Sequence, residues 1–193
     1  MRRSTCDSRP AAVIFDFDDL LCNSAPLHFE ATKRTFAEYG TAYAITPEQK
    51  QSLYGRRIPD AVSLLCDYLN VSLDKEGFLR RRNRHFIELV QTALEPMRGL
   101  EACIAAVTAL GCQRALASSG ERSYLTVGLQ RLGLTDFFPI IVSGDDVTVG
   151  KPDPAIFLLA AQRLGVAPGA CVVIEDAEVG IEAAKRAGMY AIG

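Results

Sequence analysis

Residues 12–19 read Ala-Val-Ile-Phe-Asp-Phe-Asp-Asp, a short apolar run followed by three carboxylates within four positions. An apolar run of this length, bounded by polar residues, predicts a buried strand at 12–15. Similar runs occur at 114–117, 140–142, 171–174 and 190–192, and each of these follows a stretch with helical periodicity. The alternation predicts an α/β fold with a Rossmann-like parallel sheet flanked by helices.

The segment between the first two predicted strands contains only helical signals. A capping box at Thr46 with Gln49 starts one helix, Gly55 is a stop signal, and a further helix is expected to open near Ser72. The segment is far longer than a crossover connection requires. We therefore predict a discontinuous core of residues 1–21 and 97–193, with an all-helical module of residues 22–96 inserted into it. Within the core, Gly111 and Gly165 are expected to end helices.

Bulk composition narrows the class of protein. The 193 residues are 49% hydrophobic, which favours a folded domain, and 21 Lys and Arg against 23 Asp and Glu leave no global positive field for nucleic acid or an anionic membrane. No apolar run approaches the roughly 18 residues of a membrane span, and residues 1–10 do not resemble a signal peptide. We expect a cytoplasmic protein. The six cysteines are irregularly spaced, which favours scattered thiols over disulfides or a zinc site.

In an open parallel sheet the ligand site lies beyond the carboxyl ends of the strands. Asp16 and Asp18 follow the first strand, and a period of two would make them point the same way. Two such carboxylates repel unless a cation lies between them, and oxygen ligands suit Mg²⁺. After the second strand, Ser118 and Ser119 stand at a strand-to-helix turn whose N–H groups can hold a phosphate oxygen.

The third and fourth strands lead to further candidates. Lys151 stands between Gly150 and Pro152, which gives its cationic side chain a defined origin, and Glu175 with Asp176 forms a second acidic pair that completes a metal cage. Taken singly, each signal is more often an ordinary surface turn or a solvated side chain. Their occurrence in order, each at a strand's carboxyl end, favours one shared site.

These motifs resemble those of the haloacid dehalogenase superfamily, of the β-phosphoglucomutase and phosphoglycolate-phosphatase type. The resemblance covers nearly the whole chain. The four matching motifs are residues 15–20, Ser118, Lys151 within Gly-Lys-Pro-Asp-Pro, and Glu175-Asp176 within residues 172–189. Residues 22–96 are similar to the mobile cap domain of this family.

The resemblance implies a role for each motif. Asp16 would attack phosphorus and form an aspartyl-phosphate, while Asp18 would protonate the leaving oxygen and then activate water. Ser118 and Lys151 would hold the transferring phosphoryl group. The Mg²⁺ ligands would be Asp16, the Asp18 carbonyl and Asp176, with Glu175 binding directly or behind them.

The sequence departs from the family pattern at several positions. Asp19 stands where Gly is most frequent, Ala177 replaces a usual Ser, and Asn23 replaces a frequent Asp. We expect these residues to tune activity rather than abolish it. The chain stops at Gly193, where relatives usually continue with a short strand and helix, so we expect a truncated form or a fragment.

The sequence gives weaker support for residues that contact the substrate than for the catalytic motifs. His28 matches the position of a cap-hinge histidine in β-phosphoglucomutase, and the alternative is an ordinary polar residue on the first helix of the cap. Gly55, Arg56 and Arg57 resemble the family's substrate-specificity loop, although solvated arginines fit equally well. Ser119 is a further candidate.

Two other features of residues 22–96 have structural interpretations. The basic run at residues 80–85 is interpreted as a solvated helix face rather than a nucleic-acid patch, because it wraps around the helix. Phe29, Phe36 and Tyr39 fall at helical spacing and are expected in the core.

Together, the sequence predicts a Mg²⁺-dependent phosphatase acting on a small phosphorylated metabolite, such as a sugar phosphate or a phosphorylated small acid. A haloacid dehalogenase would leave Asp18 without a role, because a departing halide needs no acid. A phosphomutase would share every catalytic residue and stays open, as does a non-catalytic binding protein that retains the fold. We expect a monomer that binds neither nucleic acid nor membrane.

Overall fold

The computed structural model describes residues 9–53 and 58–193. These residues form two compact units. One contains the described residues up to Asn23 together with Glu95–Gly193, and the other contains Ser24–Leu94. Among the described residues, no helix has both the length and the apolar character needed to cross a membrane.

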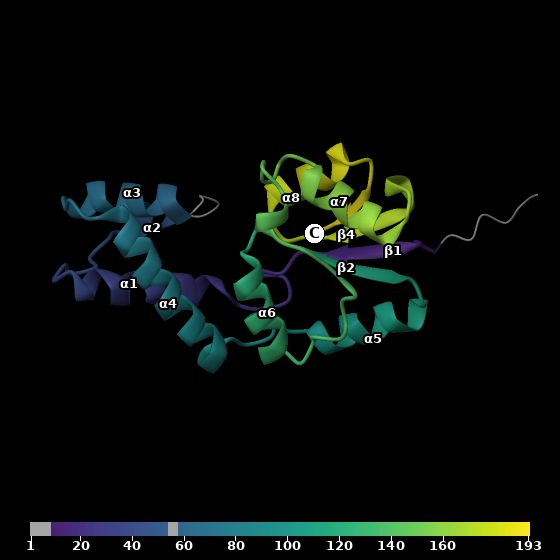
Figure 1. Ribbon diagram of the computed structural model, residues 1–193, viewed down its shortest axis with the longest axis horizontal. Helices are drawn as coiled ribbons and strands as arrows, with labels where there is room; N and C mark the ends of the chain where they lie inside the picture. The colour runs from purple at the N-terminus through teal and green to yellow at the C-terminus, as the bar shows by residue number, and fades with distance from the viewer. Residues whose placement is uncertain (1–8, 54–57) are drawn as a thin grey trace, which may run out of the picture. The chain divides into compact units, whose positions relative to one another are not determined.

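The first unit is built on a five-stranded sheet in which all neighbouring strands are parallel (Figure 1). The strand order is β3-β2-β1-β4-β5. Its strands are β1 (Ala12–Phe15), β2 (Gln113–Ala117), β3 (Ile140–Val142), β4 (Cys171–Ile174) and β5 (Tyr190–Ile192). The predicted fold class is confirmed, and β2 begins one residue earlier than predicted.

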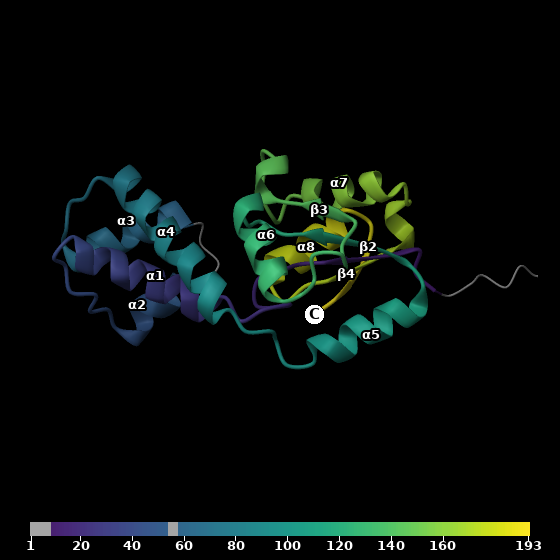
Figure 2. The same ribbon diagram turned by 60° about the horizontal axis from the view of Figure 1, so that its bottom comes forward.

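Helices cover both faces of this sheet. Figures 1 and 2 show α7 (Ala155–Leu164) and α8 (Glu178–Arg186) on one face, and α5 (Leu100–Leu110) and α6 (Arg122–Arg131) on the other. Short 3-10 turns, η1 (Gly144–Asp146) and η2 (Pro168–Ala170), precede α7 and β4. Every residue of β1 is buried, as expected for a central parallel strand that has helices on both sides.

The core under α7 and α8 follows from the strand register. Ile14 pairs with Ala115 and Val173, and these alternate positions face the same side of the sheet. They pack against Phe157 and other apolar residues of the two helices. As predicted, α5 and α7 end at Gly111 and Gly165, whose φ angles of 67° and 69° are left-handed.

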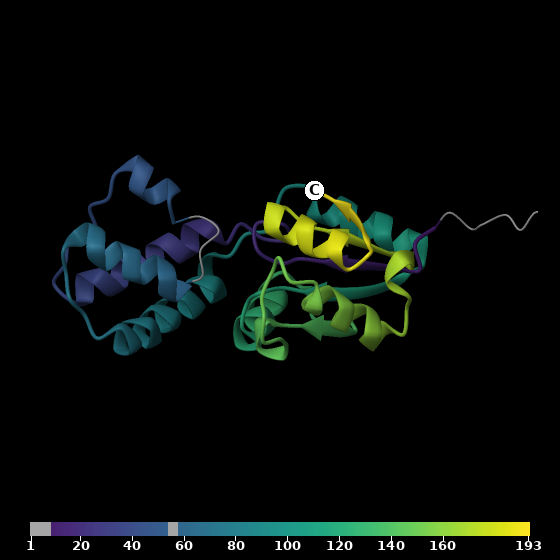
Figure 3. The same ribbon diagram turned by 90° about the horizontal axis from the view of Figure 1, so that it is seen from above.

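The described residues of the second unit form four helices, shown from above in Figure 3: α1 (Ala25–Glu38), α2 (Pro47–Gln51), α3 (Ile58–Leu69) and α4 (Lys75–Ala93). Phe36 and Phe78 are fully buried at its centre, with ring centroids 4.6 Å apart, and Phe29 and Tyr39 pack against the same cluster. The expected core positions are therefore confirmed.

The helix starts in this unit agree only partly with the sequence prediction. The capping box is present, because Thr46 Oγ1 accepts from Gln49 N at 3.2 Å and Gln49 Oε1 accepts from Thr46 N at 2.8 Å. The helix expected near Ser72 begins instead at Lys75 after Asp74. Ser and Asp are both good N-cap residues, so the residue types alone do not separate the two starts.

The interpretation of residues 80–85 as a solvated face is wrong at one residue. Arg80 and Arg81 are exposed and pair with Glu76 and Glu38. Arg82, by contrast, is only 4% exposed and donates to Thr32 Oγ1 at 3.1 Å. A basic run longer than one helical turn must direct a side chain inward. Here the inward side chain is Arg82, and a hydroxyl of α1 accepts its hydrogen bond.

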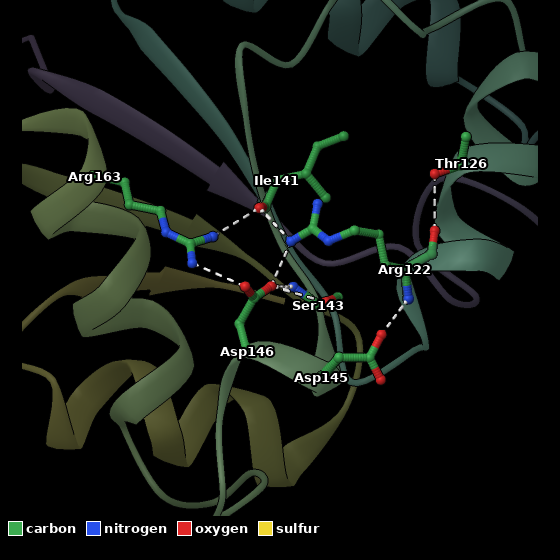
Figure 4. A network of polar contacts seen from close by, with 7 residues as sticks. All are labelled: Arg122, Thr126, Ile141, Ser143, Asp145, Asp146 and Arg163. Atoms are coloured by element: carbon green, nitrogen blue, oxygen red, sulfur yellow. Dashed lines mark hydrogen bonds and ion pairs between the residues drawn. The ribbon is translucent and has the colours of Figure 1, made fainter.

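An aspartate network fixes the loop that follows β3 (Figure 4). Asp146 accepts from Ser143 N and Oγ at 2.8 Å each, and it pairs with Arg122 of α6 and Arg163 of α7. Both guanidinium groups also donate to Ile141 O at 3.1 Å. One carboxylate thereby links the end of β3 to a helix on each face of the sheet.

We expect Asp146→Asn to lower the free energy of unfolding by about 1–2 kcal/mol at pH 7, since the guanidinium groups are partly exposed and each pair is weakened by solvent. The hydrogen bonds from Arg163 and Ser143 hold the pKa of Asp146 well below its ordinary value of 3.8. A lowered folded-state pKa stabilises the fold above pH 3.8 and loses that effect as the pH falls below it.

The measurement is urea denaturation of both proteins at pH 7 and pH 3. The difference between wild type and variant should shrink at pH 3. An unchanged difference would show that the charge of Asp146 does not contribute, and Asp136→Asn, at an exposed position, serves as the control.

Candidate active site

The strand register brings Asp16 and Glu175 together. Ile14 pairs with Val173 on adjacent strands, and two residues farther along each chain come Asp16 and Glu175. The backbone extends this pairing, because Asp16 N donates to Ile174 O at 3.0 Å. Asp16 is 6% exposed and Glu175 is 1% exposed, so two carboxylates are buried at one edge of the sheet.

Lys151 lies between these two carboxylates. Its Nζ is 2.6 Å from Asp16 Oδ1 and 3.3 Å from Glu175 Oε1, and its side chain is 6% exposed. The ammonium also lies 4.9 Å from the ring centroid of Phe157 on α7. Burial lowers the pKa of Lys151, but the charges of Asp16 and Glu175 raise it by more, so the ammonium form is favoured.

Gly180 makes room for Glu175. A Cβ at position 180 would lie 1.6 Å from Glu175 Oε1, so the first half of α8 can pass the carboxylate only if that residue has no side chain. The sequence shows this glycine on the predicted helix, but its role depends on a side chain five residues earlier.

Asp16, Glu175 and Asp176 offer carboxylate oxygens that all lie within 4.8 Å of one another. Burial raises the pKa of Asp16 to about 6 despite the pairing with Lys151, and burial together with the charge of Asp16 raises the pKa of Glu175 to about 8. The cluster holds three carboxyl groups and contacts one ammonium. An oxygen-only donor set with excess negative charge fits a hard divalent cation.

Asp18 has a separate set of partners. Tyr124 donates from its hydroxyl to Asp18 Oδ1 at 2.6 Å, and Ser118 Oγ lies 3.5 Å from Oδ2. Ser118 Oγ in turn accepts from Gly120 N at 3.1 Å. β1 ends at Phe15, so both aspartates lie beyond the strand, and their carboxylates have different neighbours.

Tyr124 is the site residue that sequence reasoning missed. A tyrosine two residues into a predicted helix is usually read as core, and Tyr124 is indeed 4% exposed. A usable signal was available, because a buried phenolic hydroxyl needs a hydrogen-bond partner and this helix begins just after the Ser118 turn.

The structure places the other candidates as follows. Ser119 is exposed, and its carbonyl lies against Gly144, where a Cβ would come within 2.3 Å of the oxygen. His28 is half-buried on α1 of the second unit, accepts from Arg82 at 2.6 Å through Nδ1 and stacks on Phe86. Gly55, Arg56 and Arg57 lie outside the described residues.

Two departures from the family pattern have structural explanations. Asp19 has a φ angle of 53°, a left-handed conformation that favours Gly and that Asp tolerates better than most residues. Ala177 is the N-cap residue of α8 and makes no side-chain capping bond, whereas a serine there would be able to make one.

The family described as haloacid dehalogenase-like hydrolase matches residues 13–193, and the chain belongs to this family. The family and the relatives that are named phosphatases show that the chain is a phosphohydrolase.

Three relatives illustrate the similarity. A phosphorylated carbohydrates phosphatase from Thermotoga maritima is 35% identical over 94% of this chain and 83% of its own length. A β-phosphoglucomutase from Bacillus subtilis is 33% identical over 94% of this chain and 82% of its own. The crystal structure of CbbY from Rhodobacter sphaeroides in complex with phosphate has a TM-score of 0.80 and 26% identity, covering 94% of this chain and 84% of that one.

Gly180→Ala should displace Glu175 from Lys151, because a Cβ and the carboxylate cannot occupy the same space. We expect a loss of about 1–3 kcal/mol in the free energy of unfolding and weaker binding of Mg²⁺. Urea denaturation and calorimetric Mg²⁺ titration measure the two effects.

Gly169→Ala is the matched control, since the nearest atom to a Cβ there is 3.9 Å away and φ is not left-handed. If both variants lose the same stability and the same Mg²⁺ affinity, the absence of a side chain at position 180 does not determine where Glu175 lies.

Proposed function

We propose that this chain is a Mg²⁺-dependent phosphatase that hydrolyses a small phosphorylated carbohydrate through an aspartyl-phosphate on Asp16. The observation that carries the proposal is the buried cluster in which Lys151 contacts Asp16 and Glu175, beside a second aspartate held by hydroxyl groups. The carbohydrate class is supported by the name of the Thermotoga maritima relative.

Asp16 is the proposed nucleophile. One of its oxygens contacts Lys151 at 2.6 Å, which fixes the carboxylate at the end of β1 and leaves the other oxygen for attack on phosphorus. As the P–O bond to the substrate breaks, charge on the phosphoryl oxygens would be offset by Lys151 and by hydrogen bonds from the Ser118 turn.

Asp18 is the proposed general acid and base. Its carboxyl would give a proton to the leaving oxygen, and the resulting carboxylate would then take a proton from the water that cleaves the aspartyl-phosphate. Its hydroxyl partners, which differ from the partner of Asp16, are consistent with a role different from that of Asp16.

Mg²⁺ would be held by Asp16 and Asp176 with the Asp18 carbonyl, and by Glu175 directly or through water, and when bound it would neutralise charge between nucleophile and phosphate. Three carboxylates within 4.8 Å of one another support this assignment. The cytoplasmic location and monomeric state expected from the sequence stay predictions, as does the absence of nucleic-acid and membrane partners.

Asp16→Asn is expected to lower the rate of phosphate release by at least about a thousandfold, because an amide is a poor nucleophile. The fold should persist, since the amide has nearly the same shape. Phosphate release from a panel of sugar phosphates and phosphorylated small acids, with acid-stable phospho-enzyme trapping, measures the effect. Substantial turnover by a clean Asp16→Asn preparation would falsify the nucleophile assignment, and Asp136→Asn controls for loss of one surface carboxylate.

Activity should require Mg²⁺ and disappear in EDTA, because the uncompensated carboxylates repel an incoming phosphate. Ca²⁺ should substitute poorly, since its larger and looser coordination misplaces the nucleophile. The measurement is phosphate release across a metal titration after EDTA treatment. An unchanged rate in EDTA would contradict the metal cage.

A phosphomutase is the second candidate, and the Bacillus subtilis relative favours it. A mutase passes the phosphoryl group back to a sugar, whereas a phosphatase passes it to water. Incubation with β-glucose 1-phosphate and a bisphosphorylated glucose separates the two, because a mutase yields glucose 6-phosphate without net phosphate release.

A further inference from the structure

Tyr124 lies where it can control the orientation of Asp18. It is on the first turn of α6, is 4% exposed, and donates a 2.6 Å hydrogen bond to Asp18 Oδ1. A short O–H···O bond to a carboxylate is among the stronger hydrogen bonds in proteins. The two residues are 106 positions apart, so the contact depends on the tertiary fold.

The tyrosine ring is held in place by its neighbours. Its centroid lies 5.4 Å from that of Phe17, at 81°, in an edge-to-face arrangement. A Cβ at position 120 would come within 2.9 Å of the Tyr124 ring, so Gly120 leaves the space that the ring occupies. The hydroxyl is therefore already positioned before any ligand binds.

The two oxygens of Asp18 have different donors. Oδ1 accepts from Tyr124, while Oδ2 lies 3.5 Å from Ser118 Oγ at the turn proposed to hold the phosphoryl group. Donors on opposite oxygens fix the plane of a carboxyl group, whereas a single donor leaves it free to rotate. With Oδ1 occupied, Oδ2 is the oxygen presented toward Ser118.

We propose that Tyr124 is a positioning residue for the general acid and base, an inference that rests on the proposed phosphatase function. The hydroxyl holds Oδ1 and thereby directs Oδ2 to the leaving oxygen. Asp18 transfers its proton from Oδ2 to that oxygen as the P–O bond breaks and later receives one from the attacking water. Tyr124 keeps its own proton throughout and only donates a hydrogen bond.

A purely structural role for Tyr124 makes a different prediction. If Asp18 only serves as the hydrogen-bond acceptor that the buried hydroxyl requires, loss of the hydroxyl would disturb the turn around Ser118 and slow the reaction of all substrates alike. If it directs proton transfer, its loss should matter only where the leaving group needs a proton. A sugar alkoxide needs one, and p-nitrophenolate does not.

The test compares Tyr124→Phe with wild type in rapid-quench measurements of phospho-enzyme formation, using the best sugar phosphate and p-nitrophenyl phosphate. We expect about a tenfold or greater loss for the sugar phosphate, a small part of the 10²–10⁴-fold that a general acid contributes, and less than about threefold for p-nitrophenyl phosphate. KM should change little for either substrate. Tyr190→Phe, which removes the same hydroxyl from a residue 69% exposed, is the matched control.

A double-mutant cycle with Asp18→Asn shows whether the effect passes through Asp18. In the Asp18→Asn background, Tyr124→Phe should cause no further loss. Equal losses on both substrates, or a persisting effect in that background, would overturn the proposal.

Gly120→Ala provides a second variant that retains the hydroxyl but crowds the ring. It should reproduce the leaving-group dependence of Tyr124→Phe. Equal losses of rate on both substrates, relative to wild type, would count against the proposal. Failure of the proposed function is seen separately, as full activity of Asp16→Asn or as absence of phospho-enzyme in the wild type.

Discussion

The pairing of one buried ammonium with two buried carboxylates is the constraint on which the rest of the site depends. Asp16 and Glu175 are almost inaccessible to water, and each would be costly to bury as an anion without a partner. Lys151 contacts both from the loop before α7. Removing that cation would leave two like charges facing each other in a dry environment, so the arrangement of β1, β4 and α7 must be maintained together.

Space, rather than backbone freedom, explains the glycines around this site. Gly180 admits Glu175, Gly120 admits the ring of Tyr124, and Gly144 allows the loop after β3 to approach Ser119 O. At none of the three is a left-handed φ present. Gly180 and Gly120 make room for side chains four or five residues away along the chain, whereas Gly144 allows a close approach to a segment 25 residues earlier, and a larger side chain at any of the three would force these groups apart.

The strands were predictable because each is short, apolar and bounded by turn residues, and their carboxyl ends identified Asp16, Ser118, Lys151 and Glu175 as candidates. Residues whose role depends on a tertiary partner were not predictable in the same way. Arg82 looked solvated because its hydroxyl partner, Thr32, lies on another helix. Tyr124 was not identified as a candidate because its carboxylate partner is 106 residues away. Local pattern specifies where a strand ends, but not which distant side chain meets it there.

The fold gives two aspartates that are only two residues apart different chemical surroundings. Asp16 continues the register of β1 and meets an ammonium on the side of α7 and α8, while Asp18 lies beyond the strand and meets neutral hydroxyl groups from the β2 turn and α6. Lys151 lowers the pKa of Asp16 against the larger effect of burial, whereas the hydroxyl groups of Tyr124 and Ser118 orient the carboxyl group of Asp18. The different roles proposed for the two residues are therefore matched by different surroundings, the loop before α7 for Asp16 and the β2 turn with α6 for Asp18.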